Sequence, residues 1–423
     1  MTEARFTMHA PPLLVPARPA DWTPSDWRRR PAAQQPDWPD PALLRRVRAR
    51  LAGTAPLVRP REILGLRRAL ARAAHADAFV VQLGDCAETF EAPTFAGVAA
   101  RVDLLHTTAR TIRHTLRRPV IPVGRIAGQY AKPRSSPTER VGGHDIPSFR
   151  GHLVNRPEPD PAARVPDALR LLEGHAHARD VLALLRELAE SGMPLPDSAP
   201  DGTPAVWTSH EALLLDYEEP LVRRDPLSGA VCLTSTHLPW IGARTCEPDG
   251  AHVRFLSGLT NPVGVKIGPG TDPERLAELC ARLDPDHEPG RLVLISRMGA
   301  DRVRTALPPL VDRVARLGHP VVWLCDPMHG NTYSSGTGHK TRHVDTVGAE
   351  ISGFFAAVRA ARGWPGGIHL EATPADVTEC VGGRVGVAEE DLPLRYETAC
   401  DPRLNGTQTA ELAALTARLC GQG

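Results

Sequence analysis

The chain has 423 residues, of which 42% are hydrophobic, and its 50 basic and 49 acidic residues leave a net charge of +1. A nearly neutral chain offers no bulk charge for nucleic acid or an anionic membrane, so neither is expected as a partner. It has no apolar run of roughly 18 residues for a membrane span and no signal-peptide pattern at its start, so we expect a cytoplasmic protein.

The N-terminal segment is rich in Pro, Trp and Arg, as in the stretch WTPSDWRRRPAAQQPDWPDP. This composition predicts an extended arm packed on the main body, and residues 42–51 are predicted as an amphipathic helix after Asp40 and Pro41. We therefore divide the chain into an N-terminal arm with a short helix over residues 1–55 and a main barrel domain over residues 56–423.

Beyond the arm, short apolar runs alternate with helical patterns such as residues 274–283 and 312–318, which is the rhythm of a parallel sheet with crossover helices. This alternation predicts an α/β fold, the (β/α)8 or TIM barrel. Pro lies in or beside the third and fourth predicted strands, where it disfavours strand pairing. The eight predicted strands are residues 78–84, 119–124, 204–209, 236–242, 262–268, 291–297, 320–326 and 366–372.

The gap between the second and third predicted strands is about 80 residues long, far more than one crossover needs. It contains the strongly helical stretch PDALRLLEGHAHARDVLALLRELAESG. We therefore predict extra helices between the second and third strands, as an insertion over about residues 155–204.

Six of the predicted strands end in, or run directly into, polar or ionisable side chains. The first strand leads to Cys86, the seventh to Asp326 and His329, and the eighth carries His369 and Glu371. His369 and Glu371 have the same parity in their strand, so both are predicted to face the barrel interior. Because the active site of a (β/α)8 barrel is built from the C-terminal strand ends, these side chains are expected to converge.

The converging residues form two chemical sets. Cations suit phosphate and carboxylate groups, and they comprise Arg125, Lys132, Arg134, Arg244, Lys266 and Arg297. The second set can bind a divalent metal through a thiol, an imidazole and two carboxylates, and it comprises Cys86, His329, Glu371 and Asp401. Such a donor set could take manganese, iron, cobalt or zinc. Taken singly, each residue has an ordinary alternative role as a core thiol, a core imidazole or a solvated cation.

A series of segments resembles those of type II 3-deoxy-D-arabino-heptulosonate 7-phosphate (DAHP) synthases. The resemblance runs from about Trp27 to the C-terminus and implies a TIM barrel that condenses phosphoenolpyruvate with erythrose 4-phosphate, the first step of the shikimate pathway. The segments are QLGDCAETF, GRIAGQYAKPRSSPTE, TSHEALLLDYE, GLTNPVGVKIGP, LISRMG, WLCDPMHGNT, KTRHVDTV, GGIHLEATPADVTECVGG and YETACDPRLNGTQTAELA.

Position by position, the resemblance implies roles for both sets of residues. Arg134 and Ser135 would bind the phosphate of erythrose 4-phosphate, and Lys132 would lie between the substrates. From the chemistry of the reaction, our hypothesis is that Lys132 is a proton donor or relay near the new hydroxyl. Phosphoenolpyruvate would be held by Arg125, Arg244, Lys266 and Arg297. A divalent metal, with manganese the expected ion, would be held by Cys86, His329, Glu371 and Asp401. Members of this family associate, and we expect a homodimer.

Departures from the family pattern leave alternatives open. Ala243 in WIGART stands where the family has Glu, and His152 stands where it has Asp. The segment 155–204 is short for the family, which predicts weak or absent inhibition by aromatic amino acids and a role in secondary metabolism. An aminoDAHP synthase of an antibiotic pathway would need the same phosphoenolpyruvate pocket, and Ala243 also leaves open a non-catalytic regulatory paralogue.

Cys400 directly precedes the predicted ligand Asp401 and is expected near Cys86. A disulfide between the two cysteines would remove a metal ligand, so oxidation is predicted to inactivate the protein. The alternative is that Cys400 is a buried thiol with no such role.

Overall fold

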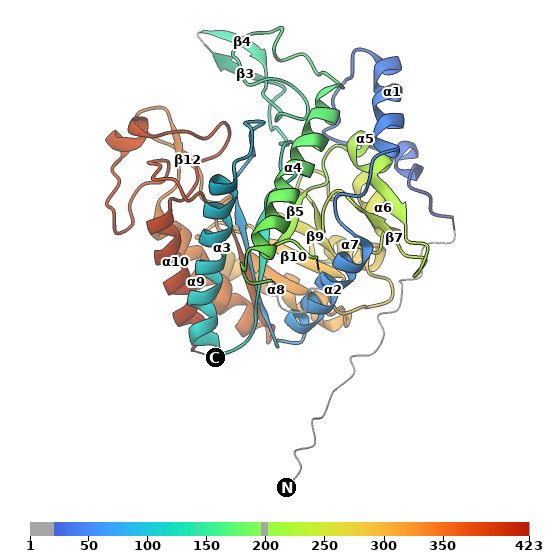
Figure 1. Cartoon of the computed structure of the whole chain (residues 1–423). Coiled ribbons are helices and arrows are strands. Elements are labelled where there is room, and N and C mark those ends of the chain that lie inside the picture. Colours follow the sequence, from blue (N-terminus) through green and yellow to red (C-terminus); the bar gives the residue numbers. More distant parts are fainter. Residues whose placement is uncertain (1–20, 142, 196–201, 423) are drawn as a thin grey trace.

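The computed structural model describes residues 21–141, 143–195 and 202–422. Its centre is a closed barrel of eight parallel strands (Figure 1), as the sequence predicts. Neighbours around the barrel are paired in the order β1 (Phe79–Gly84), β14 (Pro365–Glu371), β11 (Val322–Cys325), β10 (Leu292–Ser296), β9 (Val263–Ile267), β8 (Leu238–Ile241), β5 (Trp207–Glu211) and β2 (Val120–Arg125).

Each predicted strand contributes to one strand of the barrel, including the two with nearby Pro. The third strand is displaced toward its C-terminal end, to Trp207–Glu211. Pro204 has no N–H to donate, and the N–H of Ala205 donates to the carbonyl of Leu185 at 3.0 Å. Pairing with the barrel therefore starts later than predicted, and Glu211 becomes the strand end.

Helices cover the outside of the barrel in chain order. Successive barrel strands are joined by α3 (Phe95–Leu116), α4 (Arg170–Glu190), α6 (Ala251–Ser257), α7 (Pro273–Leu283), α8 (Val303–Arg316) and α9 (Val344–Ala360). The last helix, α10 (Gly406–Cys420), contacts both α9 and α3 and so closes the ring. Among the described residues, no helix has the length and apolar character that crossing a bilayer requires.

The connection between β2 and β5 corrects one prediction. Its described part contains a single helix, α4, rather than several. Because α4 packs on α3, it is the ordinary crossover helix of the barrel. The extra length lies largely in loops and in the hairpin of β3 (Thr138–Val141) and β4 (His144–Pro147). The prediction overlooked this hairpin because its residues lack a long apolar run.

The two ends of the barrel differ in polarity. Helix α2 (Pro60–Ala74) lies across the N-terminal end, where Leu66 and Leu70 join the same apolar cluster as Val80 and Val293 inside the barrel. The β3–β4 hairpin and the hairpin of β12 (Tyr333–Ser334) and β13 (Lys340–Thr341) lie at the opposite end (Figure 1). Polar side chains therefore gather at the C-terminal end of the strands.

The described part of the N-terminal arm packs along the barrel. It contains the short helix η1 (Asp26–Arg29) and then α1 (Pro41–Ala52), which matches the helix predicted at 42–51. Trp22 and Trp27 are buried in the main apolar cluster. The Trp27 indole also donates to Glu219 at 2.8 Å. Glu219 begins η2 (Glu219–Leu221), which with α5 (Leu215–Glu218) and the hairpin of β6 (Val222–Arg224) and β7 (Val231–Leu233) connects β5 to β8.

Candidate active site

A cavity of about 450 Å³ opens at the C-terminal end of the barrel. Its walls combine cations, two carboxylates and one indole ring. The predicted residues that line it are Arg125, Lys132, Arg134, Ser135, Arg244, Lys266, Arg297, His329 and Asp401. The structure thus places these residues around one cavity, although they are spread over more than half of the chain. The lining also includes Gln129, Glu211, Trp240, Ala243, Thr332 and Lys340.

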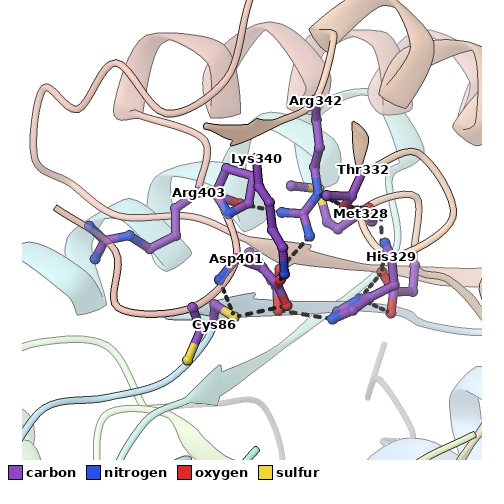
Figure 2. Close-up of polar contacts among 12 residues, drawn as sticks. Cys86, Met328, His329, Thr332, Lys340, Arg342, Asp401 and Arg403 are labelled. Atoms are coloured by element: carbon purple, nitrogen blue, oxygen red, sulfur yellow. Dashed lines mark hydrogen bonds and ion pairs between the residues drawn. The ribbon is translucent and has the colours of Figure 1, made fainter. Parts of the chain in front are cut away.

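Three of the four predicted metal ligands form a compact cluster. The ligand atoms of Cys86, Glu371 and Asp401 all lie within 4.8 Å of one another. Cys86 and Glu371 are fully buried, whereas Asp401 lines the cavity. His329 stands beside the cluster, with Nε2 3.1 Å from a Glu371 oxygen. Figure 2 shows the side chains of Cys86, Asp401 and His329 converging from separate segments of the chain. These donors fit a divalent ion of intermediate softness.

Lys132 contacts two of these candidate ligands. Its ammonium lies 2.7 Å from Cys86 Sγ and 2.7 Å from Asp401 Oδ2. Burial lowers the pKa of Lys132, but attraction to Asp401, Cys86 and Glu371 outweighs burial and holds that pKa well above its usual value. Burial raises the pKa of the Cys86 thiol. Lys132 is therefore a firmly charged ammonium at the boundary between the cluster and the cavity.

Glu371 is held as a buried anion by several cations. Arg125 donates to one of its oxygens at 3.1 Å, and Arg342 donates to the other at 2.9 Å. Burial raises the pKa of Glu371, but the nearby His329, Lys132, Arg125 and Arg342 together bring it well below its usual value. A carboxylate that stays ionised in this way is suited to binding a cation.

Asp326 orients His329. The Nδ1 atom of His329 lies 2.7 Å from Asp326 Oδ2, and Lys266 donates to the same oxygen at 2.7 Å. This contact directs Nδ1 toward Asp326, so that Nε2 faces Glu371. Asp326 is fully buried, and its contacts with His329 and Lys266 bring its pKa well below the usual value despite burial.

His369 faces the barrel interior, as its parity predicts. Its Nε2 lies 2.6 Å from an Arg125 nitrogen and 3.1 Å from Lys266 Nζ, and its Nδ1 lies 2.7 Å from Gln82 Oε1. Burial and the two cations bring the pKa of His369 well below its usual value. A neutral imidazole between two cations spaces them apart without adding charge.

Two of the cations lie over the indole ring that lines the cavity, and two further arginines also line it. The Trp240 ring lies 5.3 Å from the Arg125 guanidinium carbon and 5.6 Å from Lys266 Nζ, within reach of cation–π attraction. Arg297 donates to the carbonyl of His329 at 2.9 Å. Arg244 is exposed at the rim. The cavity therefore presents several fixed positive charges to a small, highly anionic ligand.

Comparison with known proteins assigns the family. Residues 22–201 and 196–417 match the model of the Class-II DAHP synthetase family. The chain belongs to this family.

Several relatives of this DAHP synthetase family member have known names. It is 47% identical over 377 residues to a probable phospho-2-dehydro-3-deoxyheptonate aldolase from Pseudomonas fluorescens, covering 89% of this chain and 92% of that protein. It is 41% identical over 446 aligned positions to a phospho-2-dehydro-3-deoxyheptonate aldolase from Streptomyces coelicolor, covering 96% and 99%. A third aldolase of this name, from Mycolicibacterium smegmatis, is 42% identical over 434 positions, covering 92% and 93%.

A solved structure supports the fold. The phospho-2-dehydro-3-deoxyheptonate aldolase from Francisella tularensis superposes with a TM-score of 0.54 over 89% of this chain and 97% of that chain. The sequence identity between the two is 14%, so the likeness speaks for the barrel alone.

Glu211 lines the cavity of this family member and was not predicted from the sequence. Its Oε1 is buried without a hydrogen-bond partner, and burial raises its pKa. Among the described residues, Glu211 and Asp401 are the carboxylates that line the cavity. Glu211 follows Ser209 with strand parity, which would have revealed it had the strand end been placed correctly. Ala243, the departure from the family pattern, lines the same wall and is exposed.

The two cysteines predicted to lie together do so. The thiols of Cys86 and Cys400 contact each other, and this contact lowers the pKa of Cys400. Both are free thiols, and Cys400 is partly exposed while Cys86 is fully buried. The pair therefore joins a solvent-reachable thiol to a candidate metal ligand.

Proposed function

We propose that this chain condenses phosphoenolpyruvate with erythrose 4-phosphate to DAHP and inorganic phosphate. The observation that carries the proposal is the cation-lined cavity beside the buried cluster of Cys86, Glu371 and Asp401, in a chain of the Class-II DAHP synthetase family. Two substrates that repel each other through their phosphates need such a set of fixed cations to be held close together.

The cations form two groups in the fold, and each group would bind one of the two substrates. Arg125 ends β2, Lys266 and Arg297 lie at the ends of neighbouring strands, and Arg244 lies on the loop after β8. These four cations would bind the phosphate and carboxylate of phosphoenolpyruvate. Arg134 and Ser135 lie on the loop after β2, in the same segment as Lys132, and also line the cavity. They would bind the phosphate of erythrose 4-phosphate, so that Lys132 stands between the substrates.

The protein's own groups can perform the proton transfers. C3 of phosphoenolpyruvate attacks the aldehyde carbon, and Lys132 would give a proton to the oxygen that becomes a hydroxyl. Water adds at C2 and loses a proton, for which Glu211 is suited because its pKa is raised and it lies in the cavity. The resulting hemiketal phosphate then expels inorganic phosphate.

A divalent metal fits the donor set of Cys86, Glu371 and Asp401, with His329 as a fourth ligand. When bound, such an ion polarises the aldehyde oxygen as a Lewis acid. Lys132 contacts two of these ligand atoms, so like-charge repulsion would turn its ammonium away from them and toward the cavity. Manganese is the ion we expect, and spectra of manganese-loaded protein would report sulfur ligation directly.

The proposal is tested by phosphate release from the two substrates, with and without manganese, using the purified full chain. We expect release that requires both substrates and falls by at least about 100-fold in Lys132→Ala, as for loss of a general acid. Arg134→Ala should raise the KM for erythrose 4-phosphate, and its control is Arg140→Ala, which changes an exposed arginine on β3. No release from the wild type would overturn the proposal. Greater turnover with an amino-sugar phosphate acceptor would instead assign the aminoDAHP alternative.

A further inference from the structure

We infer that Gln34, on the N-terminal arm, is a positioning residue for binding the acceptor phosphate, and that it acts through Arg134. This inference rests on the proposed function, because it takes Arg134 and Ser135 as the phosphate-binding pair. The arm would then be part of the second substrate's site rather than a cover for the outside of the barrel.

The Gln34 side chain hydrogen-bonds to both the N–H and the carbonyl of Arg134. Its Oε1 accepts from the Arg134 N–H at 2.9 Å, and its Nε2 donates to the Arg134 carbonyl at 3.1 Å. One side-chain amide therefore satisfies both backbone groups of a single loop residue, and that residue has no secondary structure around it to fix its position. The two partners are 100 residues apart in the chain.

The backbone of Gln34 supports a specific role. Its φ is +63°, a left-handed conformation that is uncommon for residues other than Gly, Asn and Asp. Such a conformation persists where surrounding contacts over-determine it. Here Arg150 donates to the carbonyl of Gln34 and, at 3.4 Å, to that of Gln35.

Arg150 extends the same network to the catalytic lysine. Its own carbonyl accepts from the N–H of Lys132 at 2.9 Å. The arm is thus connected to both ends of the short segment from Lys132 to Arg134, directly at one end and through Arg150 at the other. A displacement of the arm would shift this segment relative to the cavity.

The Arg134 side chain is aimed by a shared carboxylate. Glu139 on β3 accepts from Arg134 at 2.8 Å and from Arg164 at 2.6 Å. Two guanidinium groups share one carboxylate, so a positive charge is left over for an anion at the cavity edge. Gln34 fixes the backbone of Arg134 while Glu139 fixes its head, which together define the direction of the guanidinium.

The arm itself is anchored well enough to act as a support. The Gln35 side chain donates to the carbonyl of Leu213 at 2.8 Å and accepts from the N–H of Leu215 at 3.0 Å. Arg28 pairs with Asp216 at 2.9 Å. These contacts hold the arm on the segment after β5, close to where Gln34 meets Arg134.

The inference predicts an effect on one substrate alone. The phosphoenolpyruvate cations Lys266 and Arg297 lie on β9 and directly after β10, whereas Gln34 hydrogen-bonds to Arg134 and Arg150. Replacing Gln34 should therefore change the KM for erythrose 4-phosphate and leave that for phosphoenolpyruvate near its wild-type value.

The test is steady-state kinetics of the manganese-loaded full chain with Gln34→Ala, Gln34→Gly and Asp40→Ala. Losing two ordinary hydrogen bonds should raise the KM for erythrose 4-phosphate about tenfold in Gln34→Ala, with the phosphoenolpyruvate KM within about twofold. Gln34→Gly relaxes the left-handed backbone but lacks the amide, so it should behave like Gln34→Ala. Asp40→Ala removes the cap of α1 on the same arm and should keep both wild-type KM values.

Three results would overturn the inference while leaving the proposed function intact. They are an unchanged acceptor KM in an active Gln34→Ala enzyme, an equal rise in both KM values, and a wild-type acceptor KM in Gln34→Gly. Failure of the proposed function shows differently, as a wild-type enzyme that releases no phosphate from the two substrates.

Discussion

Glu350, a buried glutamate on α9, joins two loops of the active site. It accepts from the N–H groups of Met298 and Gly299 at 2.8 and 2.9 Å, and from the Asn331 side chain at 2.6 Å. The first loop follows Arg297 and the second follows His329. Burial and the charge of Asp326 outweigh these hydrogen bonds and raise the pKa of Glu350 to about 7.

The raised pKa makes stability depend on pH with a definite sign. The unfolded chain releases the Glu350 proton near the ordinary value of 4.5, whereas the folded chain keeps it until about 7. The contribution to stability is therefore full below pH 4.5 and is lost as the pH rises to about 7. The difference between the Glu350 pKa in the folded and the unfolded chain corresponds to about 3 kcal/mol of stability in all. About 2 kcal/mol of this is lost between about pH 5.5 and 8.5.

The variant Glu350→Gln removes this titration. Wild type should lose about 2 kcal/mol of its free energy of unfolding between about pH 5.5 and 8.5, and the variant should not show this loss. The variant should also lose an amount of stability that is the same at the two pH values, because the Gln side-chain nitrogen then faces the donating amide of Asn331. Urea unfolding at the two pH values measures the difference, and Glu390→Gln, an exposed glutamate, should follow wild type. Parallel profiles for wild type and Glu350→Gln would refute the reasoning.

Three further outcomes are expected. Arg125→Met should lower the free energy of unfolding by about 3–5 kcal/mol, because it leaves Glu371 with one fewer buried cation. Arg244→Ala, at the exposed rim, should change the free energy of unfolding by no more than about 0.5 kcal/mol but raise the KM for phosphoenolpyruvate. Chemical denaturation measures the first quantity and steady-state kinetics the second. Peroxide should inactivate the wild type reversibly, as two thiols become a disulfide while peroxide is reduced to water, and Cys400→Ser should resist; equal loss in both proteins would exclude the pair. Phe, Tyr and Trp should leave the initial rate unchanged, since the described part of the connection over residues 155–204, which is short for the family, contains the single helix α4; strong inhibition by any of them would contradict this.

The barrel could be predicted because its strands follow local rules. Apolar runs such as Val321–Leu324 are long enough to form a barrel strand, and parity alone predicts that His369 and Glu371 face the barrel interior. The same rules predict that the candidate ligands lie close together, since the C-terminal ends of parallel strands meet at one face. Cys86 and Asp401 are 315 residues apart, and they still meet because both follow barrel strands.

Other parts of the site depend on contacts that no local pattern carries. The arm was expected to pack on the barrel, but nothing in the sequence around Gln34 indicates a partner at Arg134. Asp326 was visible at a strand end, yet its contact with Lys266 on another strand appears only in the closed barrel. Glu211 was missed because a single hydrogen bond from Ala205 to α4 delays the start of its strand.

The pattern of charges links metal binding to substrate binding. Lys132 is neutralised by Asp401 at 2.7 Å, and Arg125 by Glu371 at 3.1 Å, so neither cation has its full charge available for a phosphate. Both carboxylates are candidate metal ligands, and an ion that takes over their charge would release the two cations toward the cavity. The site is thus built so that its attraction for an anionic substrate should increase after a divalent ion has bound.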